Sequence, residues 1–218
     1  MIVPINKPVG WSSFDVVKKV RKITGEKKVG HGGTLDPFAK GVLVVGIGRN
    51  STRQLSYFSN STKIYEAKLK LGSETDTLDL TGKIINDMNI PLISKEKIKS
   101  IFSEFAGYQK QIPPMFSAKK IKGVRLYKLA RQKKIVQREP IQVFIKLLEL
   151  IDYNSNSINF LVSCSKGTYV RQLGSDIAKK LGTVGHLTEL NRIQAGPYSI
   201  EDCISFSTIE KKWMSLKV

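Results

Sequence analysis

The stretch KKVGHGGTLDPFAKG (residues 27–41) places one carboxylate, Asp36, among glycines and lysines in a chain whose net charge is +18. The glycines before Asp36 allow tight turns or the close approach of another chain, and Pro37 favours an extended backbone at Asp36. Asp36 is therefore predicted to lie on a loop. On these residues alone the first interpretation is that Asp36 caps a turn, the usual task of an aspartate before proline.

Two kinds of ligand site are poorly supported around this stretch. No Gly-Lys-Ser or Gly-Lys-Thr follows the glycines at the spacing of a Walker-type phosphate loop. The chain has two histidines, His31 and His186, and they do not form the helical pair of a zinc site. Its two cysteines form neither a disulfide framework nor a metal set, which favours a reducing compartment, and Cys164 is interpreted as an apolar residue of a buried strand.

Helix and strand patterns alternate outward from this stretch. Ser12 and Asp15 form a capping-box pattern, and Gly25 is a typical stop for the helix that they begin. Between Lys63 and Gly72, apolar side chains alternate with polar ones, as in a half-buried strand. The patterns predict helices at 12–24, 94–106 and 169–181, and strands at 42–48, 63–72, 141–151 and 157–164. Strands joined by short connections predict an α+β fold, with a mixed, largely antiparallel sheet flanked by helices.

Length and hydrophobicity limit the architecture further. With 218 residues, 41% of them hydrophobic, the chain can form one substantial core, and we expect one main domain. The first residues, MIVPINKPVGWSS, lack a secretory pattern, and no apolar run approaches the roughly 18 residues of a membrane span. We therefore expect a soluble, cytoplasmic protein, with a monomer as the default state.

The basic composition indicates a polyanionic partner. Lys and Arg outnumber Asp and Glu by 36 to 18, and each phosphate that such cations neutralise releases condensed counterions. A solvated basic surface in a lysine-rich proteome is the alternative. The distribution favours nucleic acid, because residues 110–138 hold ten basic residues and no acidic one. These are Lys110, Lys119, Lys120, Lys122, Arg125, Lys128, Arg131, Lys133, Lys134 and Arg138.

This segment predicts an RNA-binding insertion at about 108–140. QIPPMFSA (111–118) opens it as an extended loop, because consecutive prolines exclude helix. Phe116 and Tyr127 lie among the cations and have two interpretations: they stack on bases, or they anchor the segment to the core.

Five blocks of this sequence resemble the TruB family of pseudouridine synthases, in the family's order and over most of the chain. GHGGTLDP (30–37) and SKGTYVR (165–171) together form the most specific pair. The other blocks are INKPVGWSSFDVV (5–17), TDTLDLTG (75–82) and IPPMFSAKKIKGVRLYKLAR (112–131). The resemblance implies the pseudouridine synthase catalytic fold and an isomerase that needs no cofactor and no metal.

The reaction implied by the resemblance converts uridine to pseudouridine at position 55, in the TΨC loop of tRNA. The base is flipped into a pocket, its C1′–N1 bond is broken, and it is rejoined to C1′ through C5. The implied partner is therefore the TΨC stem-loop of tRNA. A polyanionic partner agrees with the net charge of +18.

Three positions match the family's active-site residues. Asp36 is implied to be the catalytic aspartate, acting as a nucleophile or as the base that removes the C2′ hydrogen. Arg171 is implied to be the partner of this carboxylate, whereas a surface or phosphate-binding arginine is the commoner fate of this residue type. Tyr65 is implied to stack on the uracil and to transfer a proton, and a core aromatic is the alternative.

Further positions are implied to bind the RNA substrate. His31 is expected near the flipped base, with an exposed loop histidine as the alternative. Lys7 is expected beside the site, and Leu190 in the apolar wall of the pocket. In the insertion, the expected RNA-binding residues are Lys119, Lys120, Arg125, Tyr127 and Arg131. Asp76 and Asp79 are interpreted as turn residues, not as catalytic ones.

The expected domain organisation is a single catalytic domain at 1–218. Many bacterial members of the family carry a PUA domain after this core, and we expect none here because the sequence ends at Val218. Alternatives are an RNA chaperone on the same fold, a basic ribosome-associated protein, and a synthase for a different RNA. The first two do not need Asp36, Tyr65 and Arg171 together, so the intact set favours the enzyme.

Overall fold

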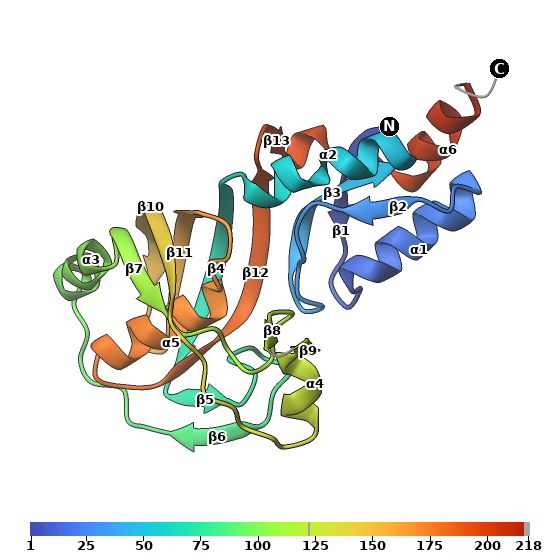
Figure 1. Cartoon of the computed structure of the whole chain (residues 1–218). Helices are drawn as coiled ribbons and strands as arrows, with labels where there is room; N and C mark the ends of the chain where they lie inside the picture. The colour runs from blue at the N-terminus through green and yellow to red at the C-terminus, as the bar shows by residue number, and fades with distance from the viewer. Residues whose placement is uncertain (122, 216–218) are drawn as a thin grey trace. The chain divides into compact units, whose positions relative to one another are not determined.

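The computed structural model describes residues 1–121 and 123–215 of the chain. The chain divides into two compact units. Unit 1 comprises Met1–Glu66 and Leu190–Val218, and unit 2 comprises Ala67–Glu189. Each unit has its own helices and sheet strands (Figure 1).

Unit 1 contains the N-terminal and C-terminal elements of the chain. They are β1 (Ile2–Lys7), α1 (Ser13–Thr24), β2 (Val29–His31), β3 (Lys40–Ile47), α2 (Arg49–Asn60), the start of β4 (Lys63–Leu71), the end of β12 (Gly185–Ala195), β13 (Tyr198–Ser199), the short 3-10 helix η1 (Ile200–Asp202) and α6 (Phe206–Ser215). Strand β3 pairs antiparallel with β1 and β2 and parallel with β12. The sheet in this unit is therefore mixed.

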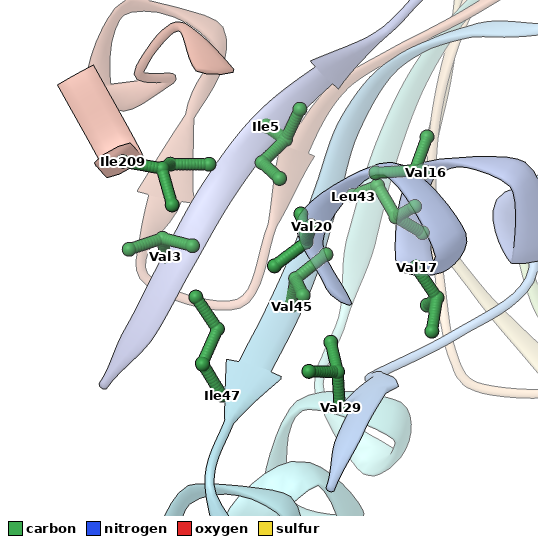
Figure 2. Close-up of a cluster of buried hydrophobic side chains, with 10 residues drawn as sticks. All are labelled: Val3, Ile5, Val16, Val17, Val20, Val29, Leu43, Val45, Ile47 and Ile209. Carbon is green, nitrogen blue, oxygen red and sulfur yellow. The ribbon is translucent and has the colours of Figure 1, made fainter. Parts of the chain in front are cut away.

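Helix α1 packs a valine-rich face on the sheet of unit 1. Its capping box joins Ser12 and Asp15, and Gly25 ends it in the left-handed conformation at φ 68°, both as the sequence predicts. The resulting core cluster (Figure 2) comprises Val3, Ile5, Val16, Val17, Val20, Val29, Leu43, Val45, Ile47 and Ile209. Each such side chain removed from water contributes roughly 1.5–3 kcal/mol, so the cluster stabilises the base of the loop 32–39, between β2 and β3.

Unit 2 contains a sheet formed by the end of β4, the start of β12 and three further strands. Its further elements are β5 (Ser73–Thr75), β6 (Ile84–Asp87), α3 (Lys95–Glu104), β7 (Gly107–Gln111), β8 (Lys120–Ile121), β9 (Val124–Arg125), α4 (Leu126–Arg131), β10 (Ile141–Tyr153), β11 (Ser157–Cys164) and α5 (Val170–Lys180). Neighbouring strands follow the order β12–β4–β11–β10–β7, and β10 is antiparallel to both β11 and β7. Strands β5–β6 and β8–β9 form separate two-stranded sheets.

The predicted α+β fold with a mixed, largely antiparallel sheet is confirmed. The predicted helices correspond to α1, α3 and α5, and the predicted strands to β3, β4, β10 and β11. In β4, Tyr65, Ala67, Leu69 and Leu71 are buried and alternate with more exposed residues. Cys164 is buried in β11, also as predicted. None of the helices in the described ranges is long and apolar enough to cross a membrane.

Candidate active site

Asp36 lies half-buried on the loop that follows β2. Ser13, the first residue of α1, fixes the preceding residue, because its Oγ accepts from Leu35 N at 2.8 Å and donates to Leu35 O at 3.1 Å. Gly10 fixes the following residue, because its N–H donates to Pro37 O at 2.8 Å. The backbone is therefore held on both sides of the carboxylate.

Lys7 is buried beside this loop, with 0% of its surface exposed. Its Nζ donates to the carbonyls of Pro8 at 2.8 Å, Trp11 at 2.6 Å and Pro37 at 3.5 Å. The structure corrects the expectation that Lys7 contacts RNA, because its ammonium group is used inside unit 1. Lys7 instead ties the end of β1 to the residue after Asp36.

Three further predicted residues belong to unit 1. Tyr65 in β4 is 8% exposed, and Cζ of Arg192 lies 6.0 Å from its ring centroid. Leu190 in β12 is also buried. His31, at the end of β2, is half-buried, so the alternative of an exposed loop histidine is wrong. Burial, assisted by the charge of Arg192, lowers the pKa of His31 and favours its neutral ring.

Arg171 lies in α5 of unit 2 and is 3% exposed, which excludes a surface arginine. Its Nη1 donates to Thr77 O at 2.5 Å and its Nη2 to Phe116 O at 2.8 Å. Nη1 also lies 3.6 Å from Oδ2 of Asp79, and both side chains are buried. Arg171 therefore links α5 to two separate loops of unit 2.

The TDTLDLTG block (75–82) forms the turn that presents Asp79 to Arg171. Oδ1 of Asp79 accepts hydrogen bonds from Thr77 Oγ1 at 2.8 Å, Thr81 N at 2.9 Å and Thr81 Oγ1 at 2.6 Å. The interpretation of Asp79 as a turn residue is confirmed. The structure adds an ion pair that the spacing of the block does not indicate.

The predicted catalytic residues fall in different units. Asp36 and Tyr65 belong to unit 1, whereas Arg171 belongs to unit 2. Each is anchored inside its own unit by hydrogen bonds or packing. The pairing of Arg171 with the Asp36 carboxylate stays a prediction.

The predicted RNA-binding insertion contains a hairpin and a short helix of unit 2. Strands β8 and β9 pair Lys120 with Arg125, and α4 follows at once. Leu126 anchors the segment, because its side chain is fully buried and its N–H donates to Lys119 O at 2.8 Å. The hairpin and α4 are thus ordered by one apolar anchor and the backbone.

Most cations of the insertion are exposed. Among the described residues these are Lys110, Lys120, Arg125, Lys128, Arg131, Lys133 and Lys134. Tyr127 is half-buried, and Cζ of Arg131 lies 5.6 Å from its ring centroid. Lys122 lies outside the described residues. An exposed surface with charges of one sign suits contacts to phosphates.

Comparison with family models identifies the family of this chain. The model of the TruB family pseudouridylate synthase (N terminal domain) matches residues 21–170. The chain belongs to the TruB family. A second model, of the tRNA pseudouridylate synthase B C-terminal domain, matches residues 171–217. The expected family is thereby confirmed.

Curated TruB relatives match almost the whole chain. The tRNA pseudouridine synthase B of Protochlamydia amoebophila is 46% identical over 208 residues, which are 95% of this chain and 79% of the relative. The tRNA pseudouridine synthase B of Geobacter sulfurreducens is 44% identical over 211 residues, which are 96% of this chain and 68% of the relative.

Solved structures share the fold of this TruB chain. A chain of the Cbf5-Nop10-Gar1 complex superposes with a TM-score of 0.75 at 27% identity, over 99% of this chain and 55% of that chain. An H/ACA RNP bound to a substrate RNA containing 2′-deoxyuridine gives a TM-score of 0.70 at 24% identity, and supports the fold alone. The TruB chain spans about half the length of both solved chains, and the predicted pseudouridine synthase fold is confirmed.

The TruB residues that the structure describes were compared with two further kinds of site, a metal centre and a reactive thiol at Cys203. Within 1–121 and 123–215, no three His, Cys, Asp or Glu side chains form a group that could hold a metal ion. Cys203 is half-buried, and burial raises the pKa of its thiol to about 11. A thiol that stays protonated at neutral pH is a poor nucleophile.

Sequence reasoning missed Arg192, which the structure places against the TruB loop that carries Asp36. It belongs to β12, whose sequence GHLTELNRIQA (185–195) is too polar to predict a buried strand. In a chain with 36 basic residues, a buried arginine looks in the sequence like any surface cation. The missing signal is therefore burial, which only the fold supplies.

Replacing Lys7 by methionine is expected to lower the free energy of unfolding by about 1–3 kcal/mol, because three carbonyls lose a donor. In the wild type, burial lowers the pKa of Lys7 from 10.5 to about 8. Between these values the unfolded chain binds more protons than the folded one, so this residue makes wild-type stability rise with pH. The stability gap between wild type and variant should therefore widen as the pH increases through this window.

Urea unfolding below and above pH 8 measures this gap. Lys19→Met, an exposed change on α1, is the matched control and should keep the wild-type pH dependence. Equal pH dependences for Lys7→Met and wild type would contradict the expectation.

Proposed function

We propose that this chain is a tRNA pseudouridine synthase that isomerises uridine to pseudouridine at position 55, in the TΨC loop of tRNA. The observation that carries the proposal is the TruB loop in which Asp36 is held between Leu35 and Pro37 by hydrogen bonds to Ser13 and Gly10. A reacting carboxylate needs a fixed backbone, because a misplacement of about 1 Å costs roughly 10²-fold in rate. The names of the curated relatives refer to the same reaction class.

The proposed reaction begins when the target uridine is flipped out of the folded tRNA. Asp36 acts as nucleophile or as base at C2′, and the C1′–N1 bond breaks. The uracil turns, C5 bonds to C1′, C5 loses its hydrogen as a proton and N1 gains one. Atoms and charge balance without a co-reactant, so the proposed reaction requires neither a metal nor a cofactor.

Other residues of the candidate site have supporting roles in this proposal. The ring of Tyr65 stacks on the flipped uracil, and Leu190 lines the apolar wall beside it. His31 offers a neutral ring next to the flipped nucleotide. Arg171 is the proposed partner of the Asp36 carboxylate, for which a guanidinium provides two donors in one plane.

The insertion at about 108–140 is proposed to grip the phosphates of the TΨC arm. Its exposed cations supply affinity, while the flipped base supplies selectivity. A monomer suffices for this arrangement. Since tRNA is the substrate, the proposed enzyme works in the cytoplasm.

Tritium release from tRNA transcript labelled with [5-³H]uridine tests the proposed function, because C5 loses its hydrogen in the reaction. We expect the wild-type protein to release tritium from one uridine per tRNA. Carbodiimide primer extension should place the product in the TΨC loop. A stop elsewhere in the tRNA would indicate a synthase for another position, and release from a different RNA only would indicate another substrate.

The competing function is an RNA chaperone that opens and reforms the tRNA arm. It is favoured by the exposed cations of the insertion, which need no carboxylate. Binding of tRNA without any tritium release would support the chaperone and refute the synthase.

Binding of tRNA is expected to weaken steeply with salt. If the insertion contacts about five phosphates, the logarithm of the dissociation constant should rise with the logarithm of salt concentration with a slope of about 4. Lys119→Gln combined with Lys120→Gln should lower this slope by about 2. Filter binding over a range of potassium chloride concentrations measures both slopes.

The matched control changes two exposed lysines on α6, Lys211→Gln with Lys212→Gln. It removes the same charge but should keep the wild-type slope. A flat salt dependence in the wild type, or equal slopes for the two double variants, would contradict the proposed role of the insertion.

A further inference from the structure

Arg192 in β12 is a buried cation, 2% exposed, that contacts the first residues of the loop 32–39. Its Nη2 donates to Gly33 O at 3.1 Å and its Nη1 to Thr34 O at 3.4 Å. Its Nε donates to Val42 O at 2.6 Å. One guanidinium therefore binds the segment before Asp36 and the strand after it.

The main chain of Arg192 is fixed as firmly as its side chain. In the parallel pairing of β12 with β3, Arg192 is opposite Gly41. Gly41 has φ +112°, and a Cβ atom there would overlap the carbonyl oxygen of Arg192. A side chain at position 41 is thus excluded by both conformation and space. The close approach brings β12 against the strand that leaves the loop.

Arg192 completes the set of contacts along the backbone of the loop 32–39. Ser13 binds Leu35, and Gly10 binds Pro37. Arg192 holds the two residues that precede them, Gly33 and Thr34. Without it, the carbonyls of Gly33 and Thr34 lose these donors, while the bond from Gly32 N to Val44 O at 2.8 Å and the contacts on either side of Asp36 remain.

The same guanidinium also faces the candidate base-stacking ring. Its Cζ lies 6.0 Å from the ring centroid of Tyr65, within the range of a cation–π contact. Arg192 therefore contacts both the loop that carries Asp36 and the side chain of Tyr65. All three belong to unit 1.

We propose that Arg192 is a positioning residue that sets the carboxylate of Asp36 relative to the ring of Tyr65. This inference rests on the proposed synthase function. Arg192 acts through its neighbours and does not itself touch the reacting atoms. Its planar group is required, because three carbonyls in different directions need donors at fixed angles, which the point charge of a lysine does not reproduce.

The test compares Arg192→Lys with wild type under single-turnover conditions. The rate of tritium release is expected to fall about 10- to 100-fold, the effect of a small misplacement of the reacting group. The dissociation constant for tRNA should stay within about twofold, because the positive charge and the insertion are kept. Arg21→Lys is the matched control, since Arg21 likewise donates to the backbone in unit 1, but to one carbonyl only among the described contacts, Val29 O at 3.0 Å. It should keep the wild-type rate.

Amide NMR spectra of wild type and Arg192→Lys give a second measurement that does not depend on activity. In Arg192→Lys, shift changes should concentrate at Gly33, Thr34 and Leu35 and leave α1 unchanged. These shift changes can be interpreted even if the wild type releases no tritium. That outcome would refute the proposed function, whereas the effect of Arg192 on the loop would be decided by the NMR spectra.

Three results would overturn the inference. The first is an unchanged single-turnover rate for Arg192→Lys. The second is a weakened tRNA affinity with an unchanged rate. The third is a variant that does not fold, in both the Arg192→Lys and Arg192→Gln forms, because Arg192 would then be a core residue of unit 1 without a separable effect on the loop.

Discussion

Asp36→Asn is expected to reduce tritium release from labelled tRNA by at least about 10³-fold, with tRNA affinity almost unchanged. Asparagine has nearly the same shape as aspartate but is neither a nucleophile nor a base at neutral pH. The hydrogen bonds that hold Leu35 and Pro37 join their backbone atoms to Ser13 Oγ and Gly10 N and do not use the Asp36 carboxylate, so the loop should keep its conformation. The loss should therefore be chemical, with the same circular dichroism spectrum as wild type.

The matched control for this variant is Asp87→Asn, the same change at an exposed carboxylate of β6. It should release tritium at the wild-type rate and bind tRNA equally well. Turnover by Asp36→Asn within tenfold of wild type would return Asp36 to its first interpretation, a residue that caps a turn. A loss of tRNA binding in Asp36→Asn would indicate a structural role for the carboxylate.

Elements with strong local signals could be predicted from the sequence. Helix α1 has a capping box at Ser12 and a left-handed Gly25, and both lie within a few residues of the helix that they delimit. Strand β4 shows its buried face through alternation, from Tyr65 to Leu71. In these elements the residues that determine the conformation are neighbours in the sequence, so a local pattern suffices.

Helix α2 could not be predicted, because it lacks the usual signals at both ends. Helix α2 follows Gly48, which provides no side-chain cap, and its last turn has no basic residue. Lys63 Nζ donates to two carbonyls of its last turn, Phe58 O at 2.9 Å and Ser59 O at 2.7 Å, and to the C-cap residue, Ser61 O at 2.6 Å. A lysine at the start of the following strand thus caps the helix, a role that the usual C-cap patterns do not include.

Some features of the candidate site could likewise be predicted from the local sequence, and others could not. The loop with Asp36 follows from glycines and a proline that are adjacent in the sequence. The surroundings of Arg171 do not, because Thr77 is 94 residues away and Phe116 is 55 residues away. Family resemblance indicates that Arg171 has a role, whereas the fold shows which atoms it binds. Arg192, which acts through backbone carbonyls, has no local signal at all.

Arg171→Lys is expected to lose about 99% of the tritium-release activity and to lower the free energy of unfolding by roughly 2–4 kcal/mol. The lysine keeps the positive charge but replaces two donating nitrogens, bound to Thr77 O and Phe116 O, by one mobile ammonium. At least one buried carbonyl then loses its donor, and Asp79 loses a partner held in a fixed plane. The proposed partner of Asp36 is displaced at the same time.

Thermal unfolding and single-turnover tritium release separate the two effects. Arg53→Lys, an exposed change on α2, is the control and should leave both quantities unchanged. The double variant with Asp79→Asn should lose less stability than the sum of the single variants, because their side chains form one buried pair. Restored stability without restored turnover in the double variant would mean that Arg171 serves the reaction directly. Near-normal turnover in Arg171→Lys would instead reduce Arg171 to a structural link between α5 and the loops that contain Thr77 and Phe116.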